Sequence, residues 1–335
     1  MKKIVVTGGG GFVGKAIVRM ALERNVDCTV IGRNRYADLE SLGVRCLVGD
    51  IRDENSVSMA VRGADTVFHV AALAGIWGAW SEYHSINVVG TKNVVSACRT
   101  GSVGHLIYTS TPSVVFDRDD IRGGDETLPY PQRFLCNYAK SKVMAEKMVL
   151  AANDRNLATC AIRPHLIWGP GDPHLVPRLL MKGKRRELKR VGDGTNFVDI
   201  SYIDNVAHAH ILAAENLAGI RSAAGKAYFM SQCQPVNLWE WINDLFQRIG
   251  IEPVTDVVPF KVAYAAGAAL EMFYMLCGKK NEPRMTRFLS EQLAKSHYFS
   301  CEAIERDLGY SPVVSTEAGM EKLVEWIKCH EKNLL

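Results

Sequence analysis

The sequence predicts an α/β fold in which a doubly wound parallel sheet carries a smaller C-terminal lobe. Short apolar stretches alternate with segments whose apolar residues recur at helical spacing. A glycine-rich turn joins the first such stretch to the first helical segment. The chain has 335 residues, which is long for one hydrophobic core. Strands that alternate with helices are typical of parallel sheets with right-handed crossovers.

The strongest local signal is the glycine turn at residues 7–14, between the first strand and the first helix. Gly8 allows a tight turn, Gly11 lets the backbone approach a pyrophosphate, and Gly14 lets the helix pack on the strand. The helix N-terminus offers free N–H groups to phosphates. A turn that binds nothing is the alternative, and the flanking strand and helix argue against it. The turn therefore predicts a Rossmann dinucleotide site formed by Gly8, Gly11, Phe12, Val13 and Gly14.

The order of strands and helices indicates how the chain is divided. Strands are expected at residues 2–6, 28–31, 45–48, 66–71, 105–110, 158–163 and, at the sheet edge, 227–230. Asn237 is expected to cap a later helix that ends at Gly250. We expect residues 1–168 to form the dinucleotide-binding domain, with a segment at about 196–232 returning to it, and residues 169–335 to form mainly a substrate lobe.

The end of the second strand is expected to select the cofactor. NAD-binding folds usually place Asp or Glu there to bind the ribose 2′-hydroxyl. The stretch Ile31–Arg35 contains no acid. Arg33 instead suits the 2′-phosphate of NADP, and Arg35 is the reserve candidate. The alternative is that Arg33 is a solvated loop charge.

Two further strand ends are expected to contact the cofactor. Asp50, with Ile51 beside it, closes the third strand. Its carboxylate could accept from the adenine amino group, or it could cap the next helix. Ala71 and Ala72 follow the fourth strand, where small side chains let the backbone lie against the cofactor.

Tyr138 and Lys142 form the second chemical signal, because residues four apart share one helix face. A free phenol has a pKa of about 10, and a nearby ammonium is expected to lower it. The same lysine could hold ribose hydroxyls. This spacing is common by chance, so its weight comes from the glycine turn and from the hydroxyls of Ser110, Thr111 and Ser113 after the fifth strand.

Composition argues against several other classes of protein. A net charge of +4 is too small to indicate a nucleic-acid partner. Nine cysteines without a CxxC pair indicate reduced thiols of a cytoplasmic protein, not a disulfide framework or a zinc site, and no metal is expected. The chain enters its first strand at once, so no signal peptide is expected.

Two apolar features indicate an apolar ligand or an apolar surface that the protein contacts. The stretch Phe260–Gly278 is apolar except for Lys261 and Glu271. A charge near its centre would be costly inside a bilayer. We expect a helix that packs over the substrate lobe or rests on a surface, not a membrane span. The aromatic residues that follow the fourth strand could line a substrate pocket or plug the lobe interface, and they are Trp77, Trp80 and Tyr83.

Taken together, these motifs resemble the extended short-chain dehydrogenase/reductases. The segments that carry this likeness are Thr7–Gly14, Asn87–Thr91, Tyr138–Lys142 and Arg163–Pro164. Other segments are similar to the 3β-hydroxysteroid dehydrogenase branch, namely Tyr108–Val114, Leu166–Asp172, Tyr202–Asn205, Val191–Gly194 and Met285–Leu289.

The resemblance implies a role for each matching residue. Tyr138 would donate the proton in reduction, with Lys142 as its partner. Thr111 would polarise the carbonyl, and Ser110 is a lesser candidate for that role. The remaining matches are Asn87, which would shape the proton-relay helix, and Pro164, which would lie at the edge of the nicotinamide pocket.

The resemblance also implies a reaction. It is the reduction of a long-chain 2-alkyl-3-oxo acid to the 3-hydroxy acid, a step of lipid metabolism found in bacterial olefin biosynthesis. The choice of NADPH for this reaction rests on Arg33, because the family usually has an acid or a neutral residue at that position. A 3β-hydroxysteroid or sterol dehydrogenase is the alternative, and a non-catalytic NADP-binding sensor or scaffold is the second. The implied partner is a small, lipid-like substrate. A peripheral membrane contact, a complex with pathway enzymes and a homodimer stay open.

Overall fold

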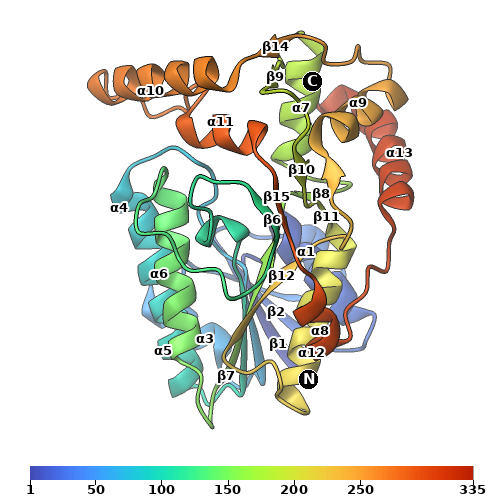
Figure 1. Cartoon of the computed structure of the whole chain (residues 1–335). Helices are drawn as coiled ribbons and strands as arrows, with labels where there is room; N and C mark the ends of the chain where they lie inside the picture. Colours follow the sequence, from blue (N-terminus) through green and yellow to red (C-terminus); the bar gives the residue numbers. More distant parts are fainter. Residues whose placement is uncertain (335) are drawn as a thin grey trace.

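Seven parallel strands form the central sheet of the computed structural model, which describes residues 1–334 (Figure 1). Their order is β12-β7-β5-β4-β1-β2-β3. The strands are β1 (Lys3–Thr7), β2 (Asp27–Gly32), β3 (Arg45–Val48), β4 (Thr66–His69), β5 (His105–Thr109), β7 (Ala158–Pro164) and β12 (Lys226–Met230). The order reverses between β1 and β4, which is where open α/β sheets bind ligands. The predicted doubly wound fold is confirmed.

Helices cover both faces of this sheet (Figure 1). One face carries α1 (Phe12–Leu22), α8 (Ile203–Ala218) and α12 (Glu302–Leu308), and the other carries α3 (Glu54–Val61), α5 (Gly90–Thr100) and α6 (Asn137–Ala151). Alternate residues of β1 face the two layers. Ile4 and Val6 enter the core beneath α1 and α8, whereas Val5 enters the core beneath α3 and α5.

Short elements connect these layers and build a second sheet. They include α2 (Ala37–Glu40), α4 (Trp80–Tyr83), the π-helix η1 (His84–Val89) and the 3-10 helix η2 (Pro112–Val114). A four-stranded sheet has the order β13 (Val236–Asn237), β10 (Phe197–Val198), β15 (His297–Phe299) and β6 (Ile121–Gly124). Two further pairs are β11 (Ser201–Tyr202) with β8 (Ile167–Trp168), and β14 (Val257–Val258) with β9 (Arg190–Val191).

The lobe at the carboxyl end of the sheet is mainly helical (Figure 1). It contains α7 (Leu175–Lys184), α9 (Leu238–Arg248), α10 (Phe260–Leu276), α11 (Arg287–Ala294) and α13 (Thr316–Leu334). The predicted cap of α9 is confirmed, because the Asn237 side chain accepts from the N–H groups of Trp239 and Glu240. Gly250 follows that helix with a φ of +73°, a backbone conformation that favours glycine.

Helix α10 extends away from the body of the lobe (Figure 1). It buries only Ala263, Gly267 and Glu271. A Cβ at Gly267 would lie 2.6 Å from the Thr286 carbonyl carbon, so the glycine lets α10 approach the start of α11. Within residues 1–334, no helix combines the length and the apolar character that a membrane crossing requires.

The cysteines differ from the sequence-based expectation. Cys233, which follows β12, forms a disulfide with Cys301, which precedes α12. The expectation that all nine are thiols is therefore wrong for these two. They are 68 residues apart in the sequence, so only the packing of α12 beside the sheet edge brings them together.

Candidate active site

The glycine turn lies at the carboxyl end of β1, and its backbone leaves no room for side chains. Gly8 has a φ of +69°, and a Cβ there would lie 2.9 Å from the Ala71 backbone. A Cβ at Gly14 would meet the Gly8 carbonyl oxygen. The Gly11 N–H donates to that oxygen over 2.9 Å. Helix α1 then begins at Phe12, so the turn brings the five predicted phosphate-facing residues together at a helix N-terminus.

Beneath this turn lies a series of hydrogen-bonded, buried polar side chains that the sequence analysis did not predict. The Thr7 hydroxyl accepts from the Ala71 N–H over 3.2 Å and bonds His69 Nδ1 over 2.8 Å. His69 Nε2 bonds the Thr91 hydroxyl over 2.9 Å. Burial lowers the pKa of His69 to about 3, so this imidazole is neutral and links β1, β4 and α5. Only the strand order, which pairs Thr7 with His69, could have revealed it.

The end of β2 distinguishes the two candidate arginines. Arg33 is exposed directly after the strand. Arg35 binds Glu40 over 3.2 Å. The Tyr36 ring occupies the space that a Cβ at Gly10 would need, so it covers the glycine turn. Within residues 1–334, Arg33 forms no ion pair, whereas Arg35 is paired with Glu40 of α2.

Asp50 is not a helix cap, so that alternative is wrong. The cap of α3 is Asp53, whose carboxylate accepts from the N–H groups of Asn55 and Ser56. The side chain of Asp50 instead binds the Arg52 guanidinium, with a shortest distance of 2.7 Å. This hydrogen bond lowers the pKa of the Asp50 carboxyl, and the charge of Arg33 acts in the same direction.

Ile51 and Ala72 occupy different surroundings. The Ile51 side chain is buried against α5, where a Cβ at Gly90 would lie 2.5 Å from its Cδ1. Ile51 can therefore contact a cofactor only through its backbone. Ala72 is exposed after β4, next to the Ala71 that backs the glycine turn.

Lys142 lies on α6 and points to the carboxyl end of β5. It is 2% exposed, and its Nζ donates to the Thr109 carbonyl oxygen over 2.6 Å. The ammonium also lies 4.1 Å from the centroid of the Tyr108 ring. Burial lowers the pKa of Lys142 to about 7. Tyr108 is a neighbour of the lysine that sequence reasoning missed, although it belongs to a segment that carries the family resemblance.

Tyr138, four residues earlier on α6, meets the hydroxyl of Thr111. Burial raises the pKa of the Tyr138 phenol above its ordinary value, while a hydrogen bond with Thr111 acts in the opposite direction. The expected lowering of this pKa by Lys142 is wrong, because the ammonium is bonded to the Thr109 backbone. The protonated phenol is the form that burial favours, and it is the form that can donate a proton.

The hydroxyls after β5 are not equivalent. Thr111 caps η2 by accepting from the Ser113 N–H over 3.2 Å. Ser110 donates its N–H to the Ile162 carbonyl, and its buried hydroxyl has no hydrogen-bond partner within residues 1–334. Thr111 is the hydroxyl whose interaction with Tyr138 opposes the effect of burial on the phenol pKa, so it remains the first candidate and Ser110 the lesser one.

Asn87 joins three segments of the site. Its Oδ1 accepts from the Leu73 N–H over 2.7 Å, and its Nδ2 donates to the Leu73 carbonyl. The same Nδ2 donates to the Ser141 hydroxyl over 2.9 Å. Asn87 lies in the π-helix η1, an irregularity often found at functional sites. It therefore fixes the loop after β4 against the helix that carries Tyr138.

Pro164 ends β7 on the same side of the sheet. It pairs in register with Met230 of β12. The following residue, His165, donates its N–H to the Ser201 hydroxyl, and its ring bonds that of His297 over 2.6 Å. Pairing with β12 on one side and the bond from the next residue to Ser201 therefore hold the backbone at Pro164 in place.

A cavity of about 940 Å³ lies between the start of α6, the loop before α4 and helix α10. Its size is at the upper end for small-molecule sites. Trp77 lines it and packs edge-on against Tyr274 of α10. Tyr83 is buried, and its ring centroid lies 6.5 Å from that of Tyr138. Trp77 thus lines a cavity and Tyr83 is buried beside Tyr138, and both interpretations of the aromatic loop stay predictions.

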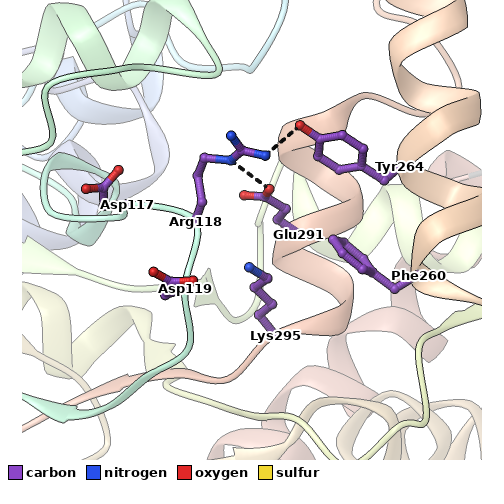
Figure 2. Close-up of a pocket in the computed structure, with 7 residues that line it drawn as sticks. All are labelled: Asp117, Arg118, Asp119, Phe260, Tyr264, Glu291 and Lys295. Carbon is purple, nitrogen blue, oxygen red and sulfur yellow. Dashed lines mark hydrogen bonds and ion pairs between the residues drawn. The ribbon is translucent and has the colours of Figure 1, made fainter.

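A smaller hollow of about 400 Å³ is lined by residues 117–119 and by residues of α10 and α11 (Figure 2). There Arg118 bridges the two helices of the lobe. It binds Glu291 of α11 over 3.2 Å and donates to the Tyr264 hydroxyl of α10 over 2.8 Å. None of the predicted site residues lines this hollow.

Comparison with known proteins decides the family. The family model described as the 3-beta hydroxysteroid dehydrogenase/isomerase family matches residues 5–261. The chain belongs to this family. It is therefore an oxidoreductase of the short-chain dehydrogenase/reductase type, acts on hydroxyl or keto groups, and has NAD(P) as its class of cofactor. The glycines whose Cβ positions are filled by backbone fit such a dinucleotide.

Individual relatives refine this placement. The 2-alkyl-3-oxoalkanoate reductase of Stenotrophomonas maltophilia is 47% identical, over 96% of this chain and 98% of that protein. The decarboxylating sterol-4-alpha-carboxylate 3-dehydrogenase of Mus musculus is 33% identical, over 97% and 90%. Among solved structures, the DesIV double mutant, a dTDP-glucose 4,6-dehydratase from Streptomyces venezuelae with NAD and DAU bound, superposes with a TM-score of 0.76. It is 23% identical over 99% of both chains and shows the shared fold.

Proposed function

We propose that the protein reduces a long-chain 2-alkyl-3-oxoalkanoate to the 2-alkyl-3-hydroxyalkanoate with NADPH. The observation that carries this proposal is the bond from the Lys142 ammonium to the Thr109 carbonyl, which joins the helix that carries Tyr138 to the end of β5, two residues before Thr111. The cavity of about 940 Å³ at the start of α6 offers room for a bulky apolar ligand. The high identity to a reductase of this name supports the choice of substrate.

The residues divide the chemistry among them. A bound nicotinamide supplies the hydride that the carbonyl carbon accepts. Thr111 and Tyr138 hydrogen-bond the carbonyl oxygen, where negative charge develops in the transition state. Tyr138 then gives its proton to that oxygen. Lys142 holds the helix that carries Tyr138 against the end of β5 through its bond to the Thr109 carbonyl. Asn87 fixes α6 in place for this transfer.

The proposed cofactor is NADP(H) and not NAD(H). Arg33 follows β2 without an acid beside it, whereas a carboxylate there would repel a 2′-phosphate. Asp50 lies near enough for the charge of Arg33 to affect it, but its carboxylate is engaged by Arg52. The exposed guanidinium of Arg33 could therefore pair with the phosphate.

We also propose that the protein works in the cytoplasm and that α10 rests on a lipid surface. Leu276 is 81% exposed and Met275 is 63% exposed, and Met272 and Phe273 are at least half exposed. Lys279 and Lys280 follow them, which suits anionic headgroups. Such a contact would place the cavity beneath α10 next to the source of an apolar substrate.

A 3β-hydroxysteroid or sterol dehydrogenase is the second candidate, supported by the relative from Mus musculus. The two are separated by comparing kcat/KM for 2-alkyl-3-oxo acids with kcat/KM for 3β-hydroxysteroids. Each buried methylene contributes about 0.8 kcal/mol, so activity on the acids should rise roughly fourfold per methylene before it levels off. A preference for steroids, or no trend with chain length, contradicts the proposal. A non-catalytic sensor would oxidise no NADPH with either substrate.

A further inference from the structure

Arg287 is held in an unusual way at the start of α11. Glu271 of α10 is buried, and each of its carboxylate oxygens accepts one hydrogen bond from Arg287. Oε1 accepts the backbone N–H over 2.7 Å, and Oε2 accepts the Nε–H over 2.7 Å. The ion pair therefore uses the Nε of the guanidinium and leaves the two terminal nitrogens outside that pair, with the Tyr264 hydroxyl of α10 as a further neighbour of the guanidinium. The side chain is 38% exposed, so a ligand can reach it.

The same arginine lines the larger cavity, which the start of α6 also lines. Cys136 and Asn137, which immediately precede Tyr138, line that cavity with it. The next residue, Phe288, packs in one apolar cluster with Cys136 and Tyr138. Arg287 thus lines the same cavity as the two residues that precede the proton donor, and its neighbour Phe288 packs with that donor.

Three lysines also line the cavity, but they are arranged differently. The ammonium of Lys140 lies 4.2 Å from the Trp80 ring, and that of Lys279 lies 5.1 Å from the Tyr274 ring. Lys140 leaves α6 two residues after Tyr138, which directs it to another face of the helix. Lys279 and Lys280 follow the end of α10. Of the cations that line the cavity, Arg287 alone is oriented by a buried carboxylate through two hydrogen bonds.

We propose that Arg287 binds the carboxylate of the 2-alkyl-3-oxoalkanoate, an inference that rests on the proposed function. In such an acid the carboxylate carbon and the reacting carbonyl carbon are both bonded to C2. A group that anchors the carboxylate must therefore lie near Tyr138, and Arg287 lines the cavity together with the two residues that precede Tyr138. A guanidinium pairs with a carboxylate through two parallel hydrogen bonds, which also fixes the orientation of the ligand.

Glu271 is the positioning residue in this arrangement. It compensates the charge of Arg287 before substrate arrives, so the cavity stays compatible with alkyl chains. It also holds the guanidinium in one orientation, which reduces the entropy lost on binding. A neutral sterol offers no group to Arg287. The arginine thus gives selectivity for acids, a class that includes sterol carboxylates, over neutral sterols.

The test compares a 2-alkyl-3-hydroxy acid with its methyl ester in the oxidative direction, because 3-oxo acids lose CO₂ in solution. The variant is Arg287→Gln, and Arg118→Gln is the matched control, since Arg118 also ties the lobe helices through Glu291 (Figure 2). We expect Arg287→Gln to lower kcat/KM for the acid by about 10- to 100-fold and to leave the ester nearly unchanged. Arg118→Gln should preserve the wild-type ratio of acid to ester.

The inference is overturned if Arg287→Gln keeps the wild-type ratio, or if Arg118→Gln changes it as much. A wild-type enzyme that oxidises neither compound contradicts the proposed function itself, which separates the two failures. Should Arg287→Gln not fold, Arg287→Lys serves instead. It keeps the charge but loses the paired hydrogen bonds, so KM for the acid should rise while KM for the ester does not. An unchanged KM for the acid would overturn the inference.

Discussion

Two regions that flank the larger cavity are built in different ways: the catalytic side around α6, whose reacting groups lie outside the cavity lining, and helix α10. On the catalytic side, the side chains of Asn87 and Lys142 are buried and bonded to backbone of two other segments. On the opposite side, helix α10 buries three of its 17 residues and is held mainly by the Glu271–Arg287 pair and the close approach at Gly267. The difference shows that the reacting groups are positioned rigidly, while helix α10 is held by few buried contacts.

The largest effect is expected on the catalytic side. Tyr138→Phe removes the proton donor and leaves the glycine turn intact. We expect turnover to fall by about 10²- to 10⁴-fold while NADPH binding, followed by fluorescence, stays close to wild type. Leu276→Ser, on the exposed end of α10, is the control with unchanged turnover. Turnover near the wild-type value in Tyr138→Phe would remove this residue from the mechanism.

A smaller effect is expected at the cofactor edge of the same side. Two charge-assisted hydrogen bonds from Arg33 to a 2′-phosphate, less the cost of dehydration, amount to about 2–3 kcal/mol, or a roughly 30- to 150-fold preference for NADPH. Arg33→Ala should raise KM for NADPH and hardly change the kinetics with NADH. Arg35→Ala is the control, because Arg35 is bonded to Glu40. Equal use of both cofactors by the wild-type enzyme, or a loss of both in Arg33→Ala, contradicts this role.

Replacing Lys142 should show by how much its buried ammonium lowers the stability of the folded protein. Between its folded pKa of about 7 and its unfolded pKa of about 10.4, the unfolded chain binds the extra proton, so stability rises with pH. Lys142→Met removes this dependence. The variant should be inactive and more stable than wild type below pH 7, with Tm higher by roughly 2–4 °C per 1 kcal/mol gained. The gain should shrink towards pH 10. A lower Tm at pH 6 would show that the bond to Thr109 outweighs the buried charge.

The smallest effect on stability is expected on α10. Met275→Ser and Leu276→Ser alter residues that are 63% and 81% exposed, so Tm should change by less than about 2 °C. Cosedimentation with anionic lipid vesicles should nevertheless fall several-fold, because the apolar contact is lost. Val313→Ser, exposed far along the chain, is the control that should leave both unchanged. Vesicle binding that survives both α10 changes would contradict the lipid contact.

How much the sequence could predict follows the same division. The strands, the glycine turn and the Asn237 cap depend on neighbours within a few residues, so local pattern was sufficient. The choice between Asp50 and Asp53 as a cap required the start of α3 to be placed within one turn. The pKa of Tyr138 required the direction in which Lys142 points, which a spacing of four residues does not fix.

Long-range contacts were beyond such reasoning. The Cys233–Cys301 disulfide and the Thr7–His69 bond join segments that only the strand order makes neighbours. The two hydrogen bonds between Glu271 and Arg287 depend on how α10 meets α11, and the sequence between them gives no pattern for that angle. The sequence could therefore indicate the chemistry of the site but not what covers it.

The position of β12 has a consequence for how the protein is made. Every residue of β7 is buried, and β12, its outer neighbour, is synthesised only after all of α6, β7 and α8. Until Met230 has left the ribosome, β7 is an apolar strand with one unpaired edge. During that interval the nascent chain is exposed to aggregation, and chaperones that shield apolar strands would act on it then. A truncation that stops before residue 226 would make this interval permanent.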